Sequence, residues 1–510
     1  MERPMEKIQS FFLLFLISIF PLIIRLTIQP FCSPYLNDDL ISTGYMADSY
    51  NYYKWLVLMG ITIVFLAMLL YRIYIVKIPL KKTWFAVPLF FLSSWLVLSL
   101  FASEHRGIAL KGFYDRYEGV LTYLCFFAIA YCIVNIQYPL EKIFRCIAIC
   151  FSIPLLVNII FNLSYLWNYN LGQLGFMKSL LIPAGVEAKL TLNTIFFNQN
   201  YSSGLSCAAC YFYFSLAIAS NHKKEKIFAL GMSCVTFASL LASLSTGGFL
   251  TFTLLFPVFF LACLIKFPRK QVMAWFTLCI FLFVIIGFVL HLTEKNKRTG
   301  PVQVYTEMGS GVYKESIGGI IDLVKSLFSA KANTKTKSPE LSIPKENDLE
   351  EFSFPPKKFS VGTGRLYLWK ITLDFILQKP LFGYGMDTYA YYCPHYRKDK
   401  INNLMATDDI LITKPHNFYL AIAFGAGIPA LLAMIALFII HFARSFSVYK
   451  QCSQNQESLG PYFAVNFFLA AFCIQWLFND SVLYTSIFFW CFLALGERIN
   501  SSLKQEKHQP

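Results

Sequence analysis

Long apolar runs alternate with short polar connections along most of the chain. Each run extends over about 20 residues, the length that an α-helix needs to cross the hydrocarbon core of a bilayer. The pattern therefore predicts an all-α integral membrane protein with about twelve transmembrane helices. They are expected near residues 9–29, 55–76, 84–102, 119–136, 143–163, 202–220, 227–244, 248–266, 272–292, 416–440, 461–478 and 483–497.

The runs divide the chain into three parts. Residues 1–292 hold the first nine predicted spans, 293–415 form a long polar segment, and 416–510 hold the last three spans with a basic tail. Within the polar segment, residues 329–358 are rich in Lys, Glu, Ser, Thr and Pro and poor in aromatic residues. This composition is typical of a disordered linker.

Helical patterning returns after Phe359. The stretch LYLWKITLDFILQ predicts a helix with an apolar side, and Pro380 and the LFGYG turn are expected to end it. The apolar side is expected to consist of Leu366, Trp369, Leu373, Ile376 and Leu377.

Composition supports a membrane location. Charged residues make up only 14% of the chain and hydrophobic residues 56%, whereas soluble domains carry about a quarter charged residues. The net charge of +15 could suggest nucleic acid, but Lys and Arg form short clusters between the apolar runs. Since no basic stripe with interleaved aromatic residues is present, we exclude nucleic acid as a partner.

The basic clusters also predict the orientation. Connections rich in Lys and Arg stay in the cytoplasm, so both termini are expected inside and the 293–415 segment outside. The first run, from Phe11 to Ile28, is too long for the apolar region of a signal peptide and is interpreted as a retained helix. One expected outer loop is mixed, because Arg106, Lys111 and Arg116 lie among acidic residues there.

Most of the 14 cysteines lie inside apolar runs, where they are interpreted as small packing residues. Cys207 and Cys210 have CxxC spacing but no second pair or nearby histidine, so no zinc site is expected. Cys32 and Cys393 both fall in segments expected outside the cytoplasm, which leaves a disulfide between them open.

Two polar clusters precede predicted spans. In FYDRYEG, Arg116 and Glu118 are either an interfacial anchor, with Arg116 paired to a neighbouring acid, or a cationic wall for an anionic substrate. In FFNQNYSSG, Asn198 and Asn200 could bind sugar hydroxyls, although N-capping by Asn200 is an adequate structural explanation.

Two further candidates lie at the end of the long segment. Arg365 follows a glycine turn and is either a solvated surface charge or a bidentate ligand for phosphate oxygens. His416 stands where the chain re-enters the membrane. It is either an interfacial histidine bonded to a backbone carbonyl or a group that accepts a proton near neutral pH.

Taken in order, these motifs resemble the O-antigen ligase and O-antigen polymerase superfamily, which consists of bacterial membrane glycosyltransferases. RYEG before the fourth span, FxNxN before the sixth, and the long outer segment between spans nine and ten carry the resemblance. The most specific block runs from Arg365 and Trp369 through the PLFGYG turn to Pro415-His416-Asn417, followed by two glycines.

The resemblance implies a GT-C-like fold in the bacterial cytoplasmic membrane and an inverting, metal-independent transfer without a cofactor. The donor would be an undecaprenyl-diphosphate-linked oligosaccharide, and the acceptor a hydroxyl of a glycan, lipid or protein. Arg365 would engage the diphosphate and His416 would activate or position the acceptor hydroxyl. Trp369 and Asn417 would contribute to substrate binding.

The chain departs from the family at one position. Many relatives carry arginine in a Ser-Arg-Gly turn after the seventh span, where this chain has Ser245-Thr246-Gly247. Arg116, Arg106 or Lys111 could supply the missing cation, or the chain could bind its donor in a different way. The motifs do not distinguish a ligase from a polymerase. A transporter of lipid-linked glycan and a non-catalytic scaffold that binds the precursor stay open as alternatives.

Overall fold

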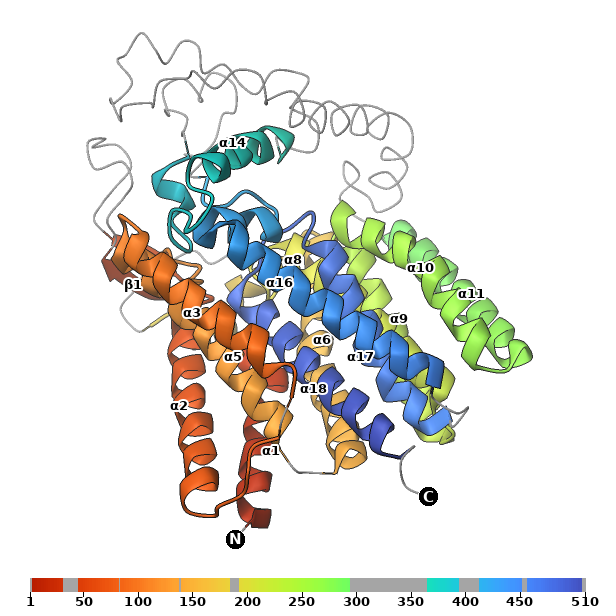
Figure 1. Cartoon of the computed structure of the whole chain (residues 1–510). Helices are drawn as coiled ribbons and strands as arrows, with labels where there is room; N and C mark the ends of the chain where they lie inside the picture. Colours follow the sequence, from red (N-terminus) through yellow and green to blue (C-terminus); the bar gives the residue numbers. More distant parts are fainter. Residues whose placement is uncertain are drawn as a thin grey trace, which may run out of the picture.

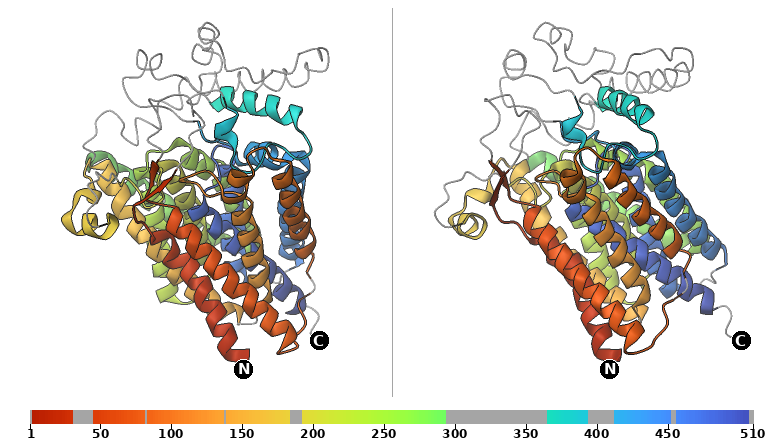
Figure 2. Two further views of the ribbon diagram at one scale, coloured as in Figure 1. Left: turned by 90° about the vertical axis from the view of Figure 1, so that its left-hand side faces the viewer. Right: turned by 60° about the vertical axis from the view of Figure 1, so that its left-hand side comes forward.

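The computed structural model describes residues 2–30, 45–81, 83–136, 139–183, 192–293, 365–393, 412–451 and 456–506. These residues form a bundle of steeply inclined helices with one short β-hairpin (Figure 1). Both chain termini lie at one end of the bundle, here called the termini end. Helix α14 (Arg365–Gln378) lies across the opposite end, here called the loop end (Figures 1 and 2).

Each predicted apolar run corresponds to a helix. The long helices are α1 (Glu2–Ser18), α2 (Tyr52–Tyr74), α3 (Ala86–Ala102), α5 (Val120–Asn135), α6 (Leu140–Leu166), α8 (Gln199–Ala219), α9 (Lys223–Ala242), α10 (Thr246–Lys266), α11 (Arg269–Thr293), α16 (Phe418–Gln451), α17 (Gln456–Gln475) and α18 (Leu483–Glu506). Within the described ranges, seven of these helices are long and apolar enough to cross a membrane. The chain is therefore a multi-pass membrane protein, and the count of twelve spans stays a prediction.

Short elements lie between the long helices. The helical ones are α4 (Arg106–Lys111), α7 (Gly175–Leu181) and the 3-10 turns η1 (Phe20–Leu22), η2 (Leu171–Gln173) and η7 (Tyr389–Tyr391). Strands β1 (Thr27–Pro30) and β2 (Tyr45–Asp48) pair antiparallel, with Thr27 opposite Asp48. The prediction of a single helix over 9–29 was wrong at its C-terminal half, because α1 ends at Ser18. The η1 turn, which contains Pro21, follows, and the chain then enters β1.

Helix α8 lies at the centre of the bundle, packed mainly against α9 and α17. Its small residues permit this close approach, since a Cβ on Gly204 would collide with the Gln475 side chain of α17. Buried amides join the same region. Asn162 of α6 donates to the hydroxyls of Ser202 (2.9 Å) on α8 and Ser239 (2.8 Å) on α9. Close packing and hydrogen bonds thus hold the central helices together. In lipid the hydrophobic effect does not drive helices toward one another, so these interactions carry the association.

The PLFGYG turn forms backbone hydrogen bonds with α16 at a point where that helix is interrupted. Gly427 has a φ of 82°, which interrupts the helix, and Gly383 has a φ of 65°. Backbone groups freed by the break pair with the turn: the amide of Gly385 donates to the carbonyl of Gly425 (2.9 Å), and that of Ile428 to Pro380 (2.7 Å). The turn therefore attaches α14 to the loop end of α16 by direct backbone bonds.

The helix predicted after Phe359 is confirmed as α14, and it ends before Pro380 as expected. Leu366 and Ile376 are buried against the loop end. The prediction was wrong for Leu377, whose side chain is 61% exposed, and Leu368 is buried instead. The expected linker at 329–358 and the Cys32 end of the proposed disulfide lie outside the described residues, so neither prediction is tested.

Candidate active site

Ionisable side chains gather at the loop end, where four short connections meet. These are the turn 112–119 before α5, residues 412–417 before α16, the turn 476–482 between α17 and α18, and the first turn of α14. None of these connections is near another in sequence. The packing of the helices places them together, since α18 packs on α5 and α17, and α14 packs on α16.

Arg116 lies in the first of these connections and is largely buried, with 11% of its side chain exposed. Its guanidinium donates to the hydroxyls of Tyr201 (3.1 Å) on α8 and Thr413 (3.2 Å). Its Nε lies 3.4 Å from the carboxylate of Asp115, so the expected pairing with a neighbouring acid is confirmed. Burial raises the pKa of Asp115 to about 7, and Arg116 only partly opposes the rise. Burial therefore works against ionisation of this carboxyl, whereas Arg116 favours it.

Lys414 and Glu118 form a buried ion pair beside Arg116. The Lys414 ammonium contacts the Glu118 carboxylate, donates to the carbonyl of Ser481 (3.2 Å) and lies 3.8 Å from Asp387. The side chains of Lys414, Glu118 and Asp387 are all at least nine-tenths buried. Burial alone would lower the pKa of Lys414, but Glu118 and Asp387 outweigh it and raise that pKa. Lys414 therefore stays protonated.

Asp387 connects this ion pair to the turn that holds Arg116. It follows the PLFGYG turn in sequence, and its carboxylate accepts hydrogen bonds from the backbone amides of Phe113 (2.7 Å) and Glu118 (3.2 Å). The Asp387 carboxylate thus joins the PLFGYG turn to the turn 112–119, since it is bonded to residues near both ends of that turn.

His416 and Asp480 form a second pair at the same end. The Nδ1 atom of His416 lies 2.8 Å from the carboxylate of Asp480, which is fully buried, whereas 42% of the His416 side chain is exposed. Burial alone would raise the pKa of Asp480, but His416, Lys414 and Arg116 outweigh it and lower that pKa. An ionised Asp480 accepts a proton-bearing Nδ1, which leaves Nε2 of a neutral His416 free to act as a base.

Arg365 begins α14 and lies near the same acid. Burial lowers the pKa of Arg365, and the neighbouring Asp480 and Tyr201 oppose this shift. Arg365, Arg116 and His416 thus come from three separate segments of the chain, and each of them interacts electrostatically with Asp480. Trp369, one turn further along α14, has a buried indole N–H without a hydrogen-bond partner in the described part of the chain.

The three candidate asparagines have structural bonds. Asn198, rather than Asn200, is the N-cap of α8, and its side chain accepts from the amide of Asn200 (2.8 Å). The side chain of Asn200 accepts from the hydroxyl of Ser245 (2.8 Å). Asn417 caps α16, because its side-chain oxygen accepts from the amide of Leu420 (3.0 Å). N-capping by Asn200 was thus the wrong assignment by two residues. Bonding of His416 to a backbone carbonyl was also wrong, since its bond is to Asp480.

The turn where relatives carry arginine adjoins this cluster. Ser245 is bonded to Asn200, and the next residue after Asn200 is Tyr201, which contacts Arg116. Arg106 and Lys111, the other two candidates for the missing cation, are exposed on α4. Among the three, Arg116 is the one that lies in the cluster.

Sequence reasoning missed Lys414, Asp387 and Asp480. Each had a weak signal: Lys414 directly precedes the Pro-His-Asn block, Asp387 follows the glycine turn by two residues, and Asp480 lies in a polar tripeptide between two apolar runs. Over the described ranges, no group of three or more His, Cys, Asp or Glu side chains is arranged to hold a metal ion.

Two comparisons with known proteins bear on the chain. Residues 231–435 match the protein-family model described as O-antigen ligase. The match covers less than half of the chain and includes Arg365, Asp387, Lys414 and His416, whereas Arg116 and Asp480 lie outside it. It confirms the resemblance to the O-antigen ligase and polymerase superfamily. The comparison with curated proteins gives no match.

Proposed function

From the premise that residues 231–435 carry an O-antigen ligase domain, we propose that this chain is a glycosyltransferase. It moves a glycan from an undecaprenyl-diphosphate-linked donor to an acceptor hydroxyl at the outer face of the bacterial cytoplasmic membrane. The observation that carries the proposal is the His416–Asp480 pair, which lies beside the cations Arg116 and Arg365 at one end of a membrane bundle.

The pair has the arrangement of a general base with its orienting acid. Asp480 holds Nδ1 of His416, so Nε2 accepts the proton as the acceptor oxygen attacks the anomeric carbon. The new C–O bond forms as the bond from the anomeric carbon to the phosphate oxygen breaks, with inversion. The electron pair of the broken bond leaves on the lipid diphosphate. The buried carboxylate stabilises the imidazolium that results.

The cations act on the leaving group. The charge on the lipid diphosphate increases as the glycosidic bond breaks, and fixed guanidinium groups stabilise that charge better than water does. Two cations are proposed to hold the lipid diphosphate, and they are here called the clamp. Arg365 is the first of them. Arg116 takes the place of the arginine that relatives carry in the Ser-Arg-Gly turn. Its interaction with Asp480 supports this role, as does its contact with Tyr201, the neighbour of the Asn200 that is bonded to Ser245 of that turn. Neither step requires a metal ion.

The distribution of basic residues supports the proposed orientation. Lys142, Arg145, Lys223, Lys224 and Lys226 begin helices at the termini end, opposite the candidate site. Positive charge of this density is usually retained in the cytoplasm, which supports an extracytoplasmic position for the loop end. A donor whose lipid tail lies in the bilayer would then reach the site laterally, while an acceptor would approach from the aqueous side.

Substituting the two arginines tests the clamp. We expect Arg365→Ala and Arg116→Ala each to lower kcat/KM for the lipid-linked donor by about 10²–10³-fold, the cost of removing one preorganised charge-stabilising donor. Lys370→Ala, on the exposed side of α14, and Arg106→Ala, on exposed α4, are the matched controls and should change little. Release of lipid diphosphate from liposomes is the measurement. Full turnover in Arg116→Ala would show that another group supplies the second cation.

A further inference from the structure

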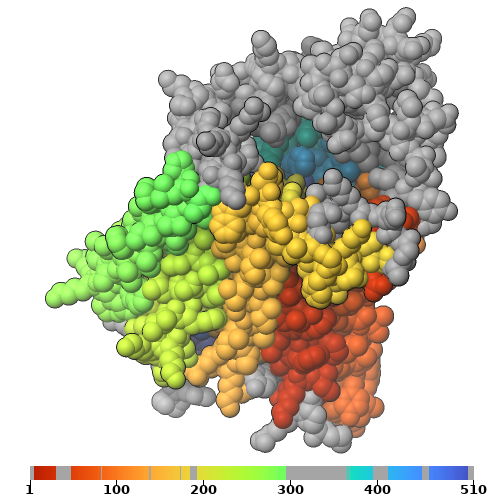
Figure 3. Space-filling view, turned by 180° about the vertical axis from the view of Figure 1, so that it is seen from behind, coloured from red at the N-terminus to blue at the C-terminus, as the bar shows by residue number. Residues whose placement is uncertain are grey.

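A cavity lies at the termini end, at the opposite end of the bundle from the candidate site. It has a volume of about 520 Å³ and lies between α6, α8, α9 and the start of α17. In the space-filling view from behind, a hollow between α6 (orange) and α9 (yellow-green) exposes blue C-terminal residues at its floor (Figure 3). The cavity therefore opens sideways, toward the space that lipids occupy around a membrane protein.

The inner part of the cavity is lined by apolar side chains. Phe144 and Ala148 of α6, Ala219 of α8 and Ala229 of α9 line it and are buried within the bundle. At its floor α8 and α17 meet closely, because a Cβ on Gly460 would lie only 3.0 Å from Ala219. The apolar side chains Ile149 and Phe228 are partly exposed at the mouth, 60% and 38% respectively. A hydrocarbon chain fits this lining, whereas a free polar metabolite does not.

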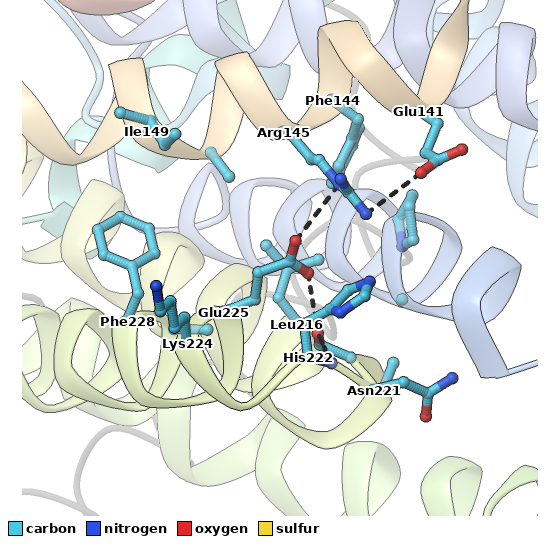
Figure 4. Close-up of a pocket in the computed structure, with 16 residues that line it drawn as sticks. Glu141, Phe144, Arg145, Ile149, Leu216, Asn221, His222, Lys224, Glu225 and Phe228 are labelled. Carbon is cyan, nitrogen blue, oxygen red and sulfur yellow. Dashed lines mark hydrogen bonds and ion pairs between the residues drawn. The ribbon is translucent and has the colours of Figure 1, made fainter.

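The rim of the cavity is charged and ordered. Arg145 lies between two acids, with its guanidinium 3.2 Å from Glu141 and 3.3 Å from Glu225 (Figure 4). Glu225 is fixed in turn by the hydroxyl of Ser220 (2.9 Å). Both acids are therefore engaged with Arg145.

Lys224 is the cation of the rim that stays available. It is exposed, and no ion pair within the described ranges involves it. It lies in the first turn of α9, whose backbone amides receive no hydrogen bond from the side chain of the N-cap residue His222. Lys223 and Lys226 add positive charge to the same turn. An anionic group at this rim would meet both an ammonium and a helix N-terminus.

We propose that this cavity binds an anionic glycerophospholipid of the adjacent leaflet. One acyl chain occupies the apolar depth, and the phosphate lies at the rim against Lys224 and the first turn of α9. Three observations support this occupant: the sideways opening, the change from apolar lining to charged rim, and the unpaired lysine beside acids that are already bonded to Arg145. The site is distinct from the proposed transfer reaction and does not depend on it.

Photolabelling tests the site in the full-length protein. The probe is phosphatidylglycerol with a diazirine on an acyl chain, mixed into phosphatidylcholine vesicles that contain the purified protein. Adducts are mapped to peptides of α6, α8 and α9 by mass spectrometry. Lys224→Glu removes the available cation, and Lys270→Glu, at an exposed position in the first turn of α11, is its matched control outside the cavity lining. Ile149→Trp narrows the mouth, and Ile160→Trp places the same side chain at an exposed position further along α6.

We expect adducts on the lining peptides in the native protein, and a loss of at least about fivefold in Lys224→Glu, the factor equivalent to one lysine's attraction for an anionic lipid surface. Ile149→Trp should lower labelling to a similar extent, and both controls should label like the native protein. Equal labelling by a photoreactive phosphatidylcholine would mean that the hollow holds ordinary surrounding lipid only. That result, or unchanged labelling in both test variants, would overturn the proposal.

Discussion

Replacing His416 by alanine is expected to slow glycan transfer by about 10²–10⁴-fold, the usual contribution of a positioned general base. The imidazole is the only group of the His416–Asp480 pair that is exposed, so it is the member that can reach an acceptor hydroxyl. Donor affinity should change little, because the arginines hold the diphosphate in the proposed mechanism. Single-turnover release of lipid diphosphate, with donor binding measured separately, distinguishes these two effects.

Two further variants sharpen this prediction. Asp480→Asn keeps the shape of the orienting side chain but removes its charge, so transfer should slow while the histidine is still present. His291→Ala changes an exposed histidine at the end of α11 and should transfer glycan at the native rate. If His416→Ala retained native turnover while binding donor normally, His416 would not be the base, whatever the role of its neighbours.

Replacing Lys414 by methionine is expected to destabilise the protein by about 3–5 kcal/mol, the cost of leaving a buried charge without its partner. The ammonium of Lys414 contacts Glu118 and lies close to Asp387, and these carboxylates are 2% and 1% exposed. Methionine preserves most of the side-chain volume, so the effect reports the lost charge more than a cavity. Equilibrium unfolding in bicelles, followed by tryptophan fluorescence, is the measurement.

Lys379→Met is the matched control for that change. Lys379 pairs with Glu104 at 2.6 Å, but their side chains are 40% and 62% exposed, so removal of this pair should cost about 0–1 kcal/mol. The double variant Lys414→Met with Glu118→Gln should recover part of the loss, because the carboxylate is then neutral as well. Equal stability of Lys414→Met and Lys379→Met would show that the ion pair does not hold the turn before α5.

Helices were the predictable part of the fold, because the solvent around them is lipid. A run of about 20 apolar residues has few alternatives to a helix when every backbone group must be satisfied internally. The boundary of α1 was missed because apolar character continues to Ile28, while Pro21 and the pairing of β1 with β2 decide the backbone there. Likewise, the break at Gly427 depends on hydrogen bonds from a turn that lies over 40 residues earlier in the chain.

The candidate site was predictable only where a family motif marked it. His416, Arg365 and Arg116 lie in such motifs, and packing brings all three around one acid. That acid, Asp480, and the buried Lys414 carry no local pattern, since their environment is created by residues far away in sequence. The sequence of a short polar turn between two apolar helices does not reveal whether its acid faces water or pairs with a histidine. Burial and pairing, which give these residues their chemistry, exist only in the folded bundle.

The most direct test of the transferase proposal is release of lipid diphosphate by the purified protein in liposomes. The donor is a lipid-diphosphate-linked oligosaccharide from the host, supplied with and without candidate acceptors, and the size of the glycan product is followed in parallel. The proposal predicts release that depends on acceptor, with a ladder of products for a polymerase or a single step for a ligase. Donor binding without release in the presence of every acceptor would contradict it and would favour a precursor-binding scaffold or a transporter.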